Sequence, residues 1–450
     1  MTNHMQWDTI IIGSGIAGLS AAIEAKQLHT RVCVIEKLPA PGGNSIISDG
    51  GIAVVGSDLQ KKFTIEDSVD CLVNDMLRAG EDKNDSDLVR LIARRSNDAY
   101  EWSKTQGVRY LDRVDFFGGH SVARCLTPTH KKGKDIVDAL YARAIDLGVV
   151  FMFKETVNNI TLEGTTAVSL RTFNSKTDQE TIHTINDRVV VATGGFGSDK
   201  AMIEKYDKRL SGLQSTNLPS ARGDMLKRME TLGAALIDMG EIQCGPWASP
   251  DEKGFGIAPL FGDYVALPHG VLINPSTASR FVNEHADRKV LTDAMLFTAY
   301  VLGIADADMV EKSGWSIEPL VRKGIVRSFD SLEAIAKDYE MDVSMFLSTI
   351  ETYNKAVRLG AQDAFGKTLK HQAPFARPPY YVMRTVAKVH HTMGGLKITT
   401  DAHVMRRVGG VFANIYAAGE CTGGVHGRSR LGSMAITECM VMGRIAGKGN

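Results

Sequence analysis

Three glycines near the start of the chain, Gly13, Gly15 and Gly18, form the pattern G-x-G-x-x-G. In this pattern the first glycine permits a tight turn, the second lets the backbone approach a pyrophosphate, and the third lets a helix pack closely on a strand. The pattern follows the apolar run "TIII" and precedes a segment rich in small residues. It therefore lies where a strand turns into a helix, whose positive dipole end would face a phosphate group.

Glu36 stands 18 residues beyond Gly18, at the end of a second apolar run, "RVCVIE". A carboxylate at this place accepts hydrogen bonds from the ribose hydroxyl groups of a bound dinucleotide. A glycine-rich turn without any ligand is the alternative. Strand, helix, second strand and acidic residue together favour the nucleotide site.

Further glycine-rich segments distinguish between two possible dinucleotides. The second strand leads into the loop "PGGNSIISDGG", and glycine strand ends follow at "VVATGGFG" (190–197) and "YAAGECTGG" (416–424). An NAD site would instead be followed by regularly alternating strands and helices. Three glycine turns spread along one chain suit a long ligand that is contacted at both ends, which favours FAD.

The elements that must position these residues are visible as apolar patterns. Residues 85–107 and 134–147 show the helical period, the first helix with Asp85 or Ser86 as N-cap. Residues 188–199 form another buried strand that ends in glycines, and residues 411–445 predict a strand, a turn and a final helix from about Ser433.

The 450 residues are too many for one compact core, so we expect two domains. The segment 234–357 lacks strand-to-helix glycine turns and carries two helical patterns, at 330–339 and 343–358. We therefore expect an α/β fold in which a first domain, residues 1–233 and 358–450, is interrupted by a second domain, residues 234–357.

Composition excludes several classes of partner. Lys+Arg and Asp+Glu are equal at 52 each, so nothing points to nucleic acid or an anionic membrane as a bulk partner. The six cysteines form no C-x-x-C motif, which excludes a thiol redox pair, a zinc knuckle and attached haem, and we expect no metal site. No apolar window is long enough to span a membrane. With no signal-peptide pattern at "MTNHMQW", we expect a cytoplasmic protein, although a mature periplasmic one would look the same.

Six stretches together resemble the flavoprotein subunit of the fumarate reductase and succinate dehydrogenase family. They are "GSGIAGLSAAIEA", "GGNSIISDGGI", "VVVATGGFG", "SRFVNEHADR", "VHHTMGGLKI" and "YAAGECTGGVHGRSRLGSMAITECMVMGRIAG". The sequence is most similar to the soluble branch that contains flavocytochrome c fumarate reductases and urocanate reductase. The resemblance implies a discontinuous Rossmann-like FAD-binding domain with an inserted α+β capping domain and a substrate held between them.

The resemblance also implies which residues bind FAD. Those near the N-terminus hold the ADP half, and the later ones line the ribityl chain and the ring. Because Asn44 stands where membrane-bound relatives carry the histidine that bonds to the flavin, we expect non-covalent FAD. The expected cofactor-binding residues are Gly13, Gly15, Ala17, Gly18, Glu36, Lys37, Gly43, Asn44, Ser45, Gly50, Gly51, Val157, Thr193, Gly194, Gly195, His391, Glu420, Arg430, Gly432, Ser433 and Met434.

Three residues match the catalytic groups of the family. His390 and Arg430 correspond to the pair that binds the substrate's first carboxylate, for which the planar guanidinium is well suited. Arg288 corresponds to the proton-donating arginine; a structural ion pair with Glu284 or Asp287 is its alternative role. A hydrogen-bonded core histidine is the alternative for His390. Arg280 is expected to be structural, and Arg428 to be a surface arginine.

The sequence departs from the fumarate reductases at the second carboxylate. Gly245 stands where those enzymes carry a histidine that binds it, and the glutamate and arginine of their proton relay are replaced by Tyr264 and Leu267. Asp263, Tyr264 or His269 could replace the relay. The aromatic residues Trp247, Phe255, Phe261 and Tyr264 suggest an aromatic or apolar distal pocket, unless they only form the core of the second domain.

We therefore expect an FAD-dependent oxidoreductase that reduces the C=C bond of an α,β-unsaturated carboxylate other than fumarate, with aryl or alkyl enoates as fitting substrates. Hydride would come from FAD N5, a proton from Arg288, and electrons from a separate reductase, redox protein or reduced flavin. One alternative is a dehydrogenase or oxidase of an amino acid, tricarboxylate or 3-ketosteroid. Another is a flavin-binding subunit without turnover.

Overall fold

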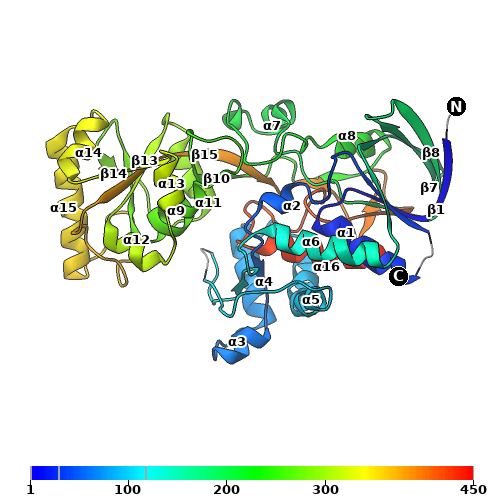
Figure 1. The fold of residues 1–450 in the computed structure, drawn as a ribbon, viewed down its shortest axis with the longest axis horizontal. Helices are drawn as coiled ribbons and strands as arrows, with labels where there is room; N and C mark the ends of the chain where they lie inside the picture. The colour runs from blue at the N-terminus through cyan, green and yellow to red at the C-terminus, as the bar shows by residue number, and fades with distance from the viewer. Residues whose placement is uncertain (1–2, 29–30, 117–118, 449–450) are drawn as a thin grey trace. The chain divides into compact units, whose positions relative to one another are not determined.

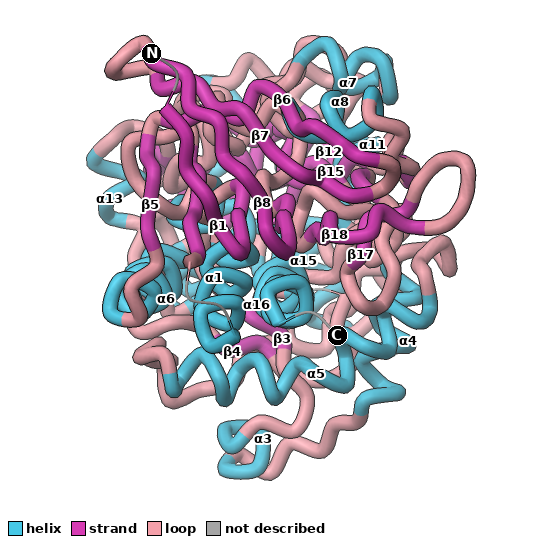
Figure 2. Tube along the Cα trace, turned by 90° about the vertical axis from the view of Figure 1, so that its right-hand side faces the viewer, coloured by secondary structure: helices cyan, strands magenta, loops and turns pink. Residues whose placement is uncertain are grey.

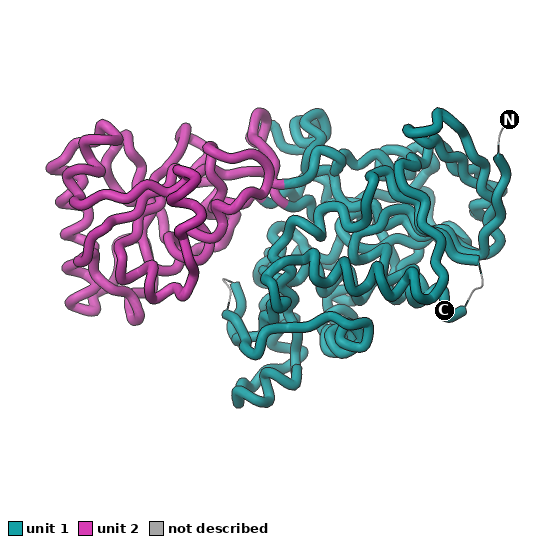
Figure 3. Tube along the Cα trace, viewed as in Figure 1, with its two compact units in different colours: residues 1–208, 217–243, 391–450 teal, residues 209–216, 244–390 magenta. Residues whose placement is uncertain are grey.

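The computed structural model describes residues 3–28, 31–116 and 119–448. The chain forms two compact units (Figure 3). The first unit comprises residues 1–208, 217–243 and 391–450, and the second comprises residues 209–216 and 244–390.

A mixed sheet forms the centre of the first unit. Within the described residues it has eight strands, in the order β17-β18-β8-β1-β2-β5, with β7 beside β8 and β6 beside β7. The strands from β18 to β5 are parallel, and Ile10 of β1 lies opposite Cys33 on one side and Val189 on the other. The strands are β1 (Asn3–Ile12), β2 (Val32–Glu36), β5 (Val150–Phe153), β6 (Glu155–Glu163), β7 (Thr166–Asn174), β8 (Gln179–Val191), β17 (His403–Met405) and β18 (Val411–Ala417).

Three helices cover one face of this sheet. The helices α1 (Ile16–Leu28), α6 (Gly133–Asp146) and α16 (Met434–Lys448) lie side by side (Figures 1 and 2). A Cβ atom added to Gly443 or Gly447 of α16 would overlap the carbonyl oxygen of Ala17 or Ala21 in α1. The two helices therefore approach as closely as their backbones allow.

The predicted helices of the first unit are present. Residues 85–107 were expected to form a helix, and α5 (Ser86–Thr105) begins after Asp85, whose carboxylate accepts hydrogen bonds from the amides of Asp87 and Leu88. The smaller elements of this unit are α2 (Asn44–Ile47), β3 (Ile52–Ala53), α3 (Asp58–Lys62), α4 (Val69–Ala79), β4 (Cys125–Leu126), α7 (Lys200–Tyr206), α8 (Asp224–Thr231), β9 (Leu236–Ile237) and β16 (Gly395–Leu396).

The second unit is built on another sheet, with the order β10-β15-β13-β11-β12 and with β14 paired to β15. Its strands are β10 (Ile242–Ala248), β11 (Val271–Asn274), β12 (Ser279–Arg280), β13 (Val301–Ala305), β14 (Val326–Phe329) and β15 (Tyr380–Thr392). Its helices are α9 (Pro259–Phe261), α10 (Leu267–His269), α11 (Arg288–Met295), α12 (Ala307–Ser313), α13 (Glu318–Arg322), α14 (Leu332–Asp338) and α15 (Val343–Leu359). A π-helix (Gly262–Ala266) joins α9 to α10, and a short 3₁₀-helix, Lys208–Leu210, lies where the chain passes between the units.

The inserted segment expected at 234–357 overlaps this second unit. The unit also contains residues 358–390, because β15 pairs with both β13 and β14. β15 follows the last helix of the unit, and no helical period or glycine turn in its sequence indicates which unit it belongs to.

A buried cluster of charges fixes the loop after α15 to the sheet. The guanidinium of Arg280 donates to Glu284 at 2.9 and 2.7 Å and to Asp363 at 2.5 Å. Lys367 lies 3.5 Å from the Glu284 carboxylate, and burial lowers the pKa of its ammonium group. The structural role predicted for Arg280 agrees with these contacts.

Among the helices that the structure describes, none combines the length and apolar character needed to cross a lipid bilayer.

Replacing Arg280 by alanine is expected to destabilise the second unit by about 3–5 kcal/mol, because Glu284 and Asp363 would remain buried without their partner. Arg358→Ala is the matched control, since Arg358 pairs with Glu351 on the surface and such pairs contribute about 1 kcal/mol or less. Calorimetric unfolding of the full chain measures both changes. Equal losses in the two variants would contradict the structural role of Arg280.

Candidate functional site

A cavity opens in the first unit at the carboxyl ends of β1, β2 and β8, and is called here the nucleotide cavity. In an α/β sheet this edge is where ligands bind, between neighbouring parallel strands. Gly13 has φ +103° and its amide donates to the carbonyl of Ile35 at 2.9 Å, which forms the tight turn into α1. The lining residues are 12–17, 35–38, 42–45, 155–157, 192–194, 220, 221, 223–225, 418–420 and 439.

Glu36 lines this cavity, and its carboxylate is held in place by backbone and side-chain donors. One carboxylate oxygen accepts from the Ser14 amide and hydroxyl at 3.0 and 2.6 Å, and the other accepts from the Leu38 amide at 2.8 Å. Each carboxylate oxygen has two lone pairs, so this orientation leaves capacity for a further donor such as a ribose hydroxyl. Lys37, beside it, binds Asp224 at 3.0 Å.

The cavity wall carries polar atoms and backbone that suit a polar, extended ligand. Among the described residues, Thr193 Oγ1 and Glu155 Oε2 are buried there without a hydrogen-bond partner. A Cβ added to Gly43 or Gly194 would meet no atom within 4 Å, so both backbones border open space. Buried polar atoms are costly unless a partner is supplied, so these residues fit the phosphates and ribose of FAD.

The expected cofactor-binding residues divide into two groups in the structure. Those that line the nucleotide cavity are Gly13, Gly15, Ala17, Glu36, Lys37, Gly43, Asn44, Ser45, Val157, Thr193, Gly194 and Glu420. The others, also in the first unit, are Gly18, Gly50, Gly51, Gly195, His391, Arg430, Gly432, Ser433 and Met434. Gly18 packs against the Gly13 carbonyl, and a Cβ on Gly51 would come within 2.9 Å of Ser433 Oγ, so the loops 50–53 and 432–434 lie together.

Glu420 connects the cavity to the histidine motif. Its carboxylate accepts from the amide and hydroxyl of Thr392 at 3.0 and 3.2 Å, and it lies 3.7 Å from His391 Nδ1. Burial raises the pKa of Glu420 to about 7 despite these donors. The His391 ring meets the ring of His426 at 5.6 Å, and His426 contacts Glu438 at 2.8 Å.

Arg430 and Arg428 differ in burial and in their partners. Arg430 is buried, its Nη1 donates to the Leu431 carbonyl at 3.2 Å, and Gln243 donates to the Arg430 carbonyl at 3.1 Å. Arg428 is only partly buried and pairs with Glu81 at 2.6 Å.

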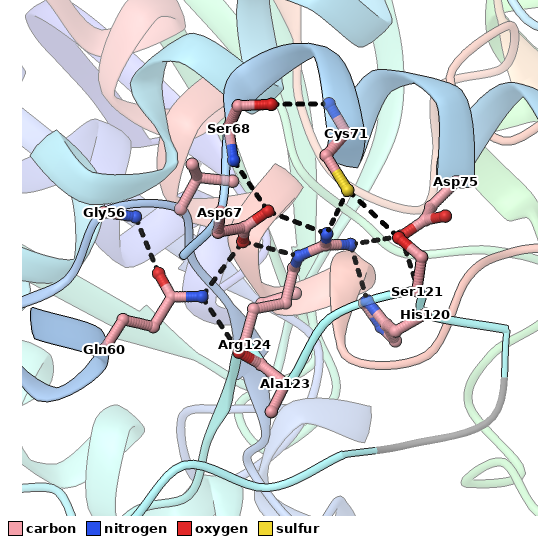
Figure 4. Close-up of polar contacts among 12 residues, drawn as sticks. Gly56, Gln60, Asp67, Ser68, Cys71, Asp75, His120, Ser121, Ala123 and Arg124 are labelled. Carbon is pink, nitrogen blue, oxygen red and sulfur yellow. Dashed lines mark hydrogen bonds and ion pairs between the residues drawn. The ribbon is translucent and has the colours of Figure 1, made fainter. Parts of the chain in front are cut away.

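A buried network centred on Arg124 was not predicted from the sequence (Figure 4). Arg124 is fully buried and binds Asp67 and Asp75 at 2.8 and 2.5 Å, and its Nη1 contacts His120 Nδ1 at 3.1 Å. Because arginine can only donate, His120 Nδ1 must accept, which leaves the proton on Nε2. Nε2 then donates to the Gly432 carbonyl at 2.9 Å.

Burial lowers the pKa of His120 to about 4, which is consistent with a neutral ring in this network. The network therefore orients the loop that contains three of the expected flavin-binding residues. An arginine within "HSVARC" carries no spacing that marks it as buried, so no sequence signal was available.

In the second unit His390 and Arg288 meet the same indole. The His390 ring lies edge-on to Trp247 with centroids 5.1 Å apart, and Arg288 Cζ lies 4.6 Å from the centre of the Trp247 ring. His390 Nδ1 contacts the Thr216 hydroxyl at 2.8 Å. The structure thus brings two of the three expected catalytic residues around one aromatic side chain.

The ion pair of Arg288 is made with Asp263, at 3.4 Å, whereas Glu284 belongs to the Arg280 cluster. Asp263 lies in the π-helix, an irregularity that is frequent at functional sites. The other relay candidates lie differently: Tyr264 stacks on Trp315, and burial lowers the pKa of His269 to about 4.

The aromatic residues expected to line a distal pocket do not all lie together in the second unit. Phe261 is fully buried in the main core of the second unit, while Phe255 lies 6.0 Å from the His390 ring. A Cβ added to Gly245 would overlap Cζ3 and Cη2 of Trp247. The space that a side chain at position 245 would use is therefore filled by indole.

Comparisons with known proteins agree with this geometry. A family model described as "FAD binding domain" matches residues 8–436. The chain is 35% identical to the acrylate reductase flavoprotein subunit of Shewanella woodyi, over 99% of this chain and 92% of that protein. It is 34% identical to a fumarate reductase (cytochrome) of Shewanella frigidimarina, over 99% and 77%, and 32% identical to a urocanate reductase of Eggerthella lenta, over 98% and 74%.

Among solved structures, the chain is similar to the open conformation of a flavocytochrome c3 fumarate reductase. The TM-score is 0.83 at 30% identity, covering 99% of this chain and 78% of that one. The resemblance seen in the six sequence stretches is confirmed, and so is the α/β flavoprotein fold.

Thr193→Val is expected to raise the stability of the FAD-free protein by about 1 kcal/mol and to weaken FAD binding about tenfold, because it removes a buried hydroxyl that only the cofactor would satisfy. Thr9→Val is the matched control: Thr9 Oγ1 on β1 is also buried without a partner among the described residues, but lies outside the cavity lining. Thermal unfolding and FAD titration measure the two quantities. A loss of FAD affinity in both variants, or in neither, would count against the assignment.

Glu420→Gln is expected to change how stability depends on pH. Since the folded-state pKa of about 7 lies above the ordinary 4.5, the folded chain holds a proton that the unfolded chain releases between these values. Stability of the FAD-free protein should therefore fall as pH rises from 4.5 to 7, by up to about 3 kcal/mol, and this loss should be absent in the variant. Melting temperatures measured across this pH range test the difference, and parallel curves would contradict it.

Proposed function

The chain belongs to the fumarate reductase family of FAD-binding flavoproteins, and from this premise we propose that it reduces the C=C bond of an α,β-unsaturated monocarboxylate. Its relatives named as acrylate, fumarate and urocanate reductases support FAD-dependent reduction of unsaturated acids. The observation that carries the monocarboxylate is Gly245, because no side chain stands where fumarate reductases bind a second carboxylate.

FAD, when bound, supplies the hydride from N5 to the β-carbon of the substrate. The chain holds the ADP half through the Gly13–Ala17 turn, Glu36 and Thr193. We propose that attachment is non-covalent, because Asn44 offers no nucleophilic ring nitrogen; its amide binds Asn217 and the Leu218 backbone instead.

His390 and Arg430 are proposed to bind the substrate carboxylate. Charge-assisted hydrogen bonds to this group would draw electron density from the conjugated double bond and stabilise the negative charge that develops when hydride adds. The Thr216 contact and the Trp247 edge hold the His390 ring in one orientation within the second unit. Arg430 is buried, so its charge acts with little screening by water.

Arg288 is proposed to donate the proton to the α-carbon. A guanidinium is a weak acid towards water, but a developing carbanion is basic enough to accept its proton. Asp263, at 3.4 Å, would then accept a proton from solvent and return it to Arg288. The pair is partly exposed, with about a quarter of each side chain accessible, so solvent can reach it.

Electrons are proposed to come from a separate donor, which could be a reductase, a redox protein or reduced flavin. We also propose a cytoplasmic location, because the six cysteines, all within the described residues, form no disulfide bond.

Enoates supplied to the purified holoenzyme, with dithionite-reduced methyl viologen as donor, test the function. We expect a monocarboxylate enoate to be reduced faster than fumarate, since loss of one charge-assisted contact costs about 1.5–3 kcal/mol, or roughly 10- to 150-fold in kcat/KM. Fumarate as the best substrate would show that another residue binds its second carboxylate. Bleaching of the oxidised flavin by a saturated amino acid, tricarboxylate or ketosteroid would instead support the reverse reaction.

Arg288→Gln and Arg428→Gln provide the matched pair for this assay. The first variant should keep FAD and lose at least about 100-fold in kcat, because it removes the proton donor. The second changes a partly buried arginine that pairs with Glu81 and should retain activity. Full turnover by Arg288→Gln would show that a different group donates the proton, whereas no enoate turnover by the wild-type protein would favour a flavin-binding subunit.

A further inference from the structure

Gly245 and Trp247 lie on the same face of β10. Successive side chains of a strand alternate between its faces, so residues two apart share one. β10 is the first strand in the sheet order, and an edge strand tolerates Pro246 between them. The indole of Trp247 folds back over Gly245, where a Cβ would overlap Cζ3 and Cη2 and come within 2.9 Å of Cε3.

These three atoms define which edge of the ring faces Gly245. Cε3, Cζ3 and Cη2 belong to the benzene ring of indole and lie on the side away from the pyrrole N–H. The surface above Gly245 is consequently a carbon edge without a hydrogen-bond donor. A carboxylate placed there would lose water without gaining a partner.

The ring is held in place by its own packing. Trp247 is 3% exposed and packs with the apolar side chains of Leu267, Leu272 and Leu291, among others. A Cβ added to Gly262 would overlap the Trp247 carbonyl oxygen, so the π-helix closes against this backbone as well. Close packing of this kind restricts movement of the indole.

The same ring contacts both expected catalytic groups of the second unit. His390 meets it at 5.1 Å and Arg288 at 4.6 Å between ring centre and Cζ. Any substrate bound by His390 and protonated by Arg288 must accommodate the Trp247 indole, which fills the space above Gly245.

We propose that Trp247 is the specificity-determining residue of this protein and restricts it to short 2-enoic acids, with hydrogen or a methyl group on the β-carbon. The inference rests on the proposed function and narrows it: the sequence predicts that aryl or alkyl enoates fit, and the indole above Gly245 is proposed to leave room only for the short ones. A second carboxylate is excluded by the same carbon edge.

Substrate selectivity of the holoenzyme tests this proposal with acrylate, crotonate, cinnamate and fumarate. In the wild-type protein we expect kcat/KM for acrylate and crotonate to exceed that for cinnamate at least tenfold. Trp247→Ala should shift the acrylate-to-cinnamate ratio towards cinnamate by roughly tenfold or more, and Trp247→Phe by less. The shift should fall mainly in KM, because the indole is proposed to limit space and not to transfer a proton.

Two further variants separate selectivity from general damage. Trp315→Ala removes another tryptophan of the second unit, the one that stacks on Tyr264, and should leave the substrate ratio unchanged. Gly245→Ala should lower activity towards every enoate, because its methyl group overlaps the indole. The same change in a Trp247→Ala background should be tolerated.

Equilibrium binding measurements test the role of Trp247 separately from the proposed enoate reduction. Dissociation constants of acrylate and cinnamate are measured from the perturbation of the oxidised flavin spectrum, which needs no turnover. A shift of their ratio in Trp247→Ala supports the role of Trp247 even if no enoate is reduced, in which case the proposed function fails alone. Equal ratios in the wild type, Trp247→Phe and Trp247→Ala, or tight binding of cinnamate by the wild type, would overturn the inference.

Discussion

The first unit depends on the close contact between α1 and α16. Helix α1 follows the first strand of the chain and α16 is the last helix, yet they meet at the distance that Gly443 and Gly447 permit. A side chain at either position would push the helices apart, and with them the segments that each helix joins to the sheet. Burial of two helices and a parallel sheet is what joins the two ends of the chain into one core.

This contact explains how the nucleotide cavity is assembled from residues far apart in sequence. The turn from Gly13 to Ala17 opens α1, while Glu420 follows β18, the strand that precedes α16. Both sets of residues lie at the carboxyl edge of the same sheet because β18, β8 and β1 run parallel and adjacent. The Arg124 network then fixes the loop before α16 through His120 and the Gly432 carbonyl.

Sequence predicted the elements whose signals are local. The turn at Gly13, the buried strands β1 and β2 and the N-cap at Asp85 all follow from spacing and residue type within a short window. The Arg124 network and the fold of Trp247 over Gly245 could not be predicted in this way. Both depend on which side chains a tertiary contact brings together, and an arginine or a tryptophan in a strand or loop has several possible partners.

The packing of Trp247 over Gly245 bears on how, under the proposed function, a distal carboxylate site can be lost without leaving a cavity. Losing a histidine would open space in a packed unit, and an empty space of that size is destabilising. A large residue two positions along the same strand face fills the space and keeps the volume nearly constant. On the proposed function, the carbon edge of Trp247 would keep the unit packed and would weaken the binding of a charged distal group. The same ring contacts His390 and Arg288, the residues proposed to bind the substrate carboxylate and to donate the proton.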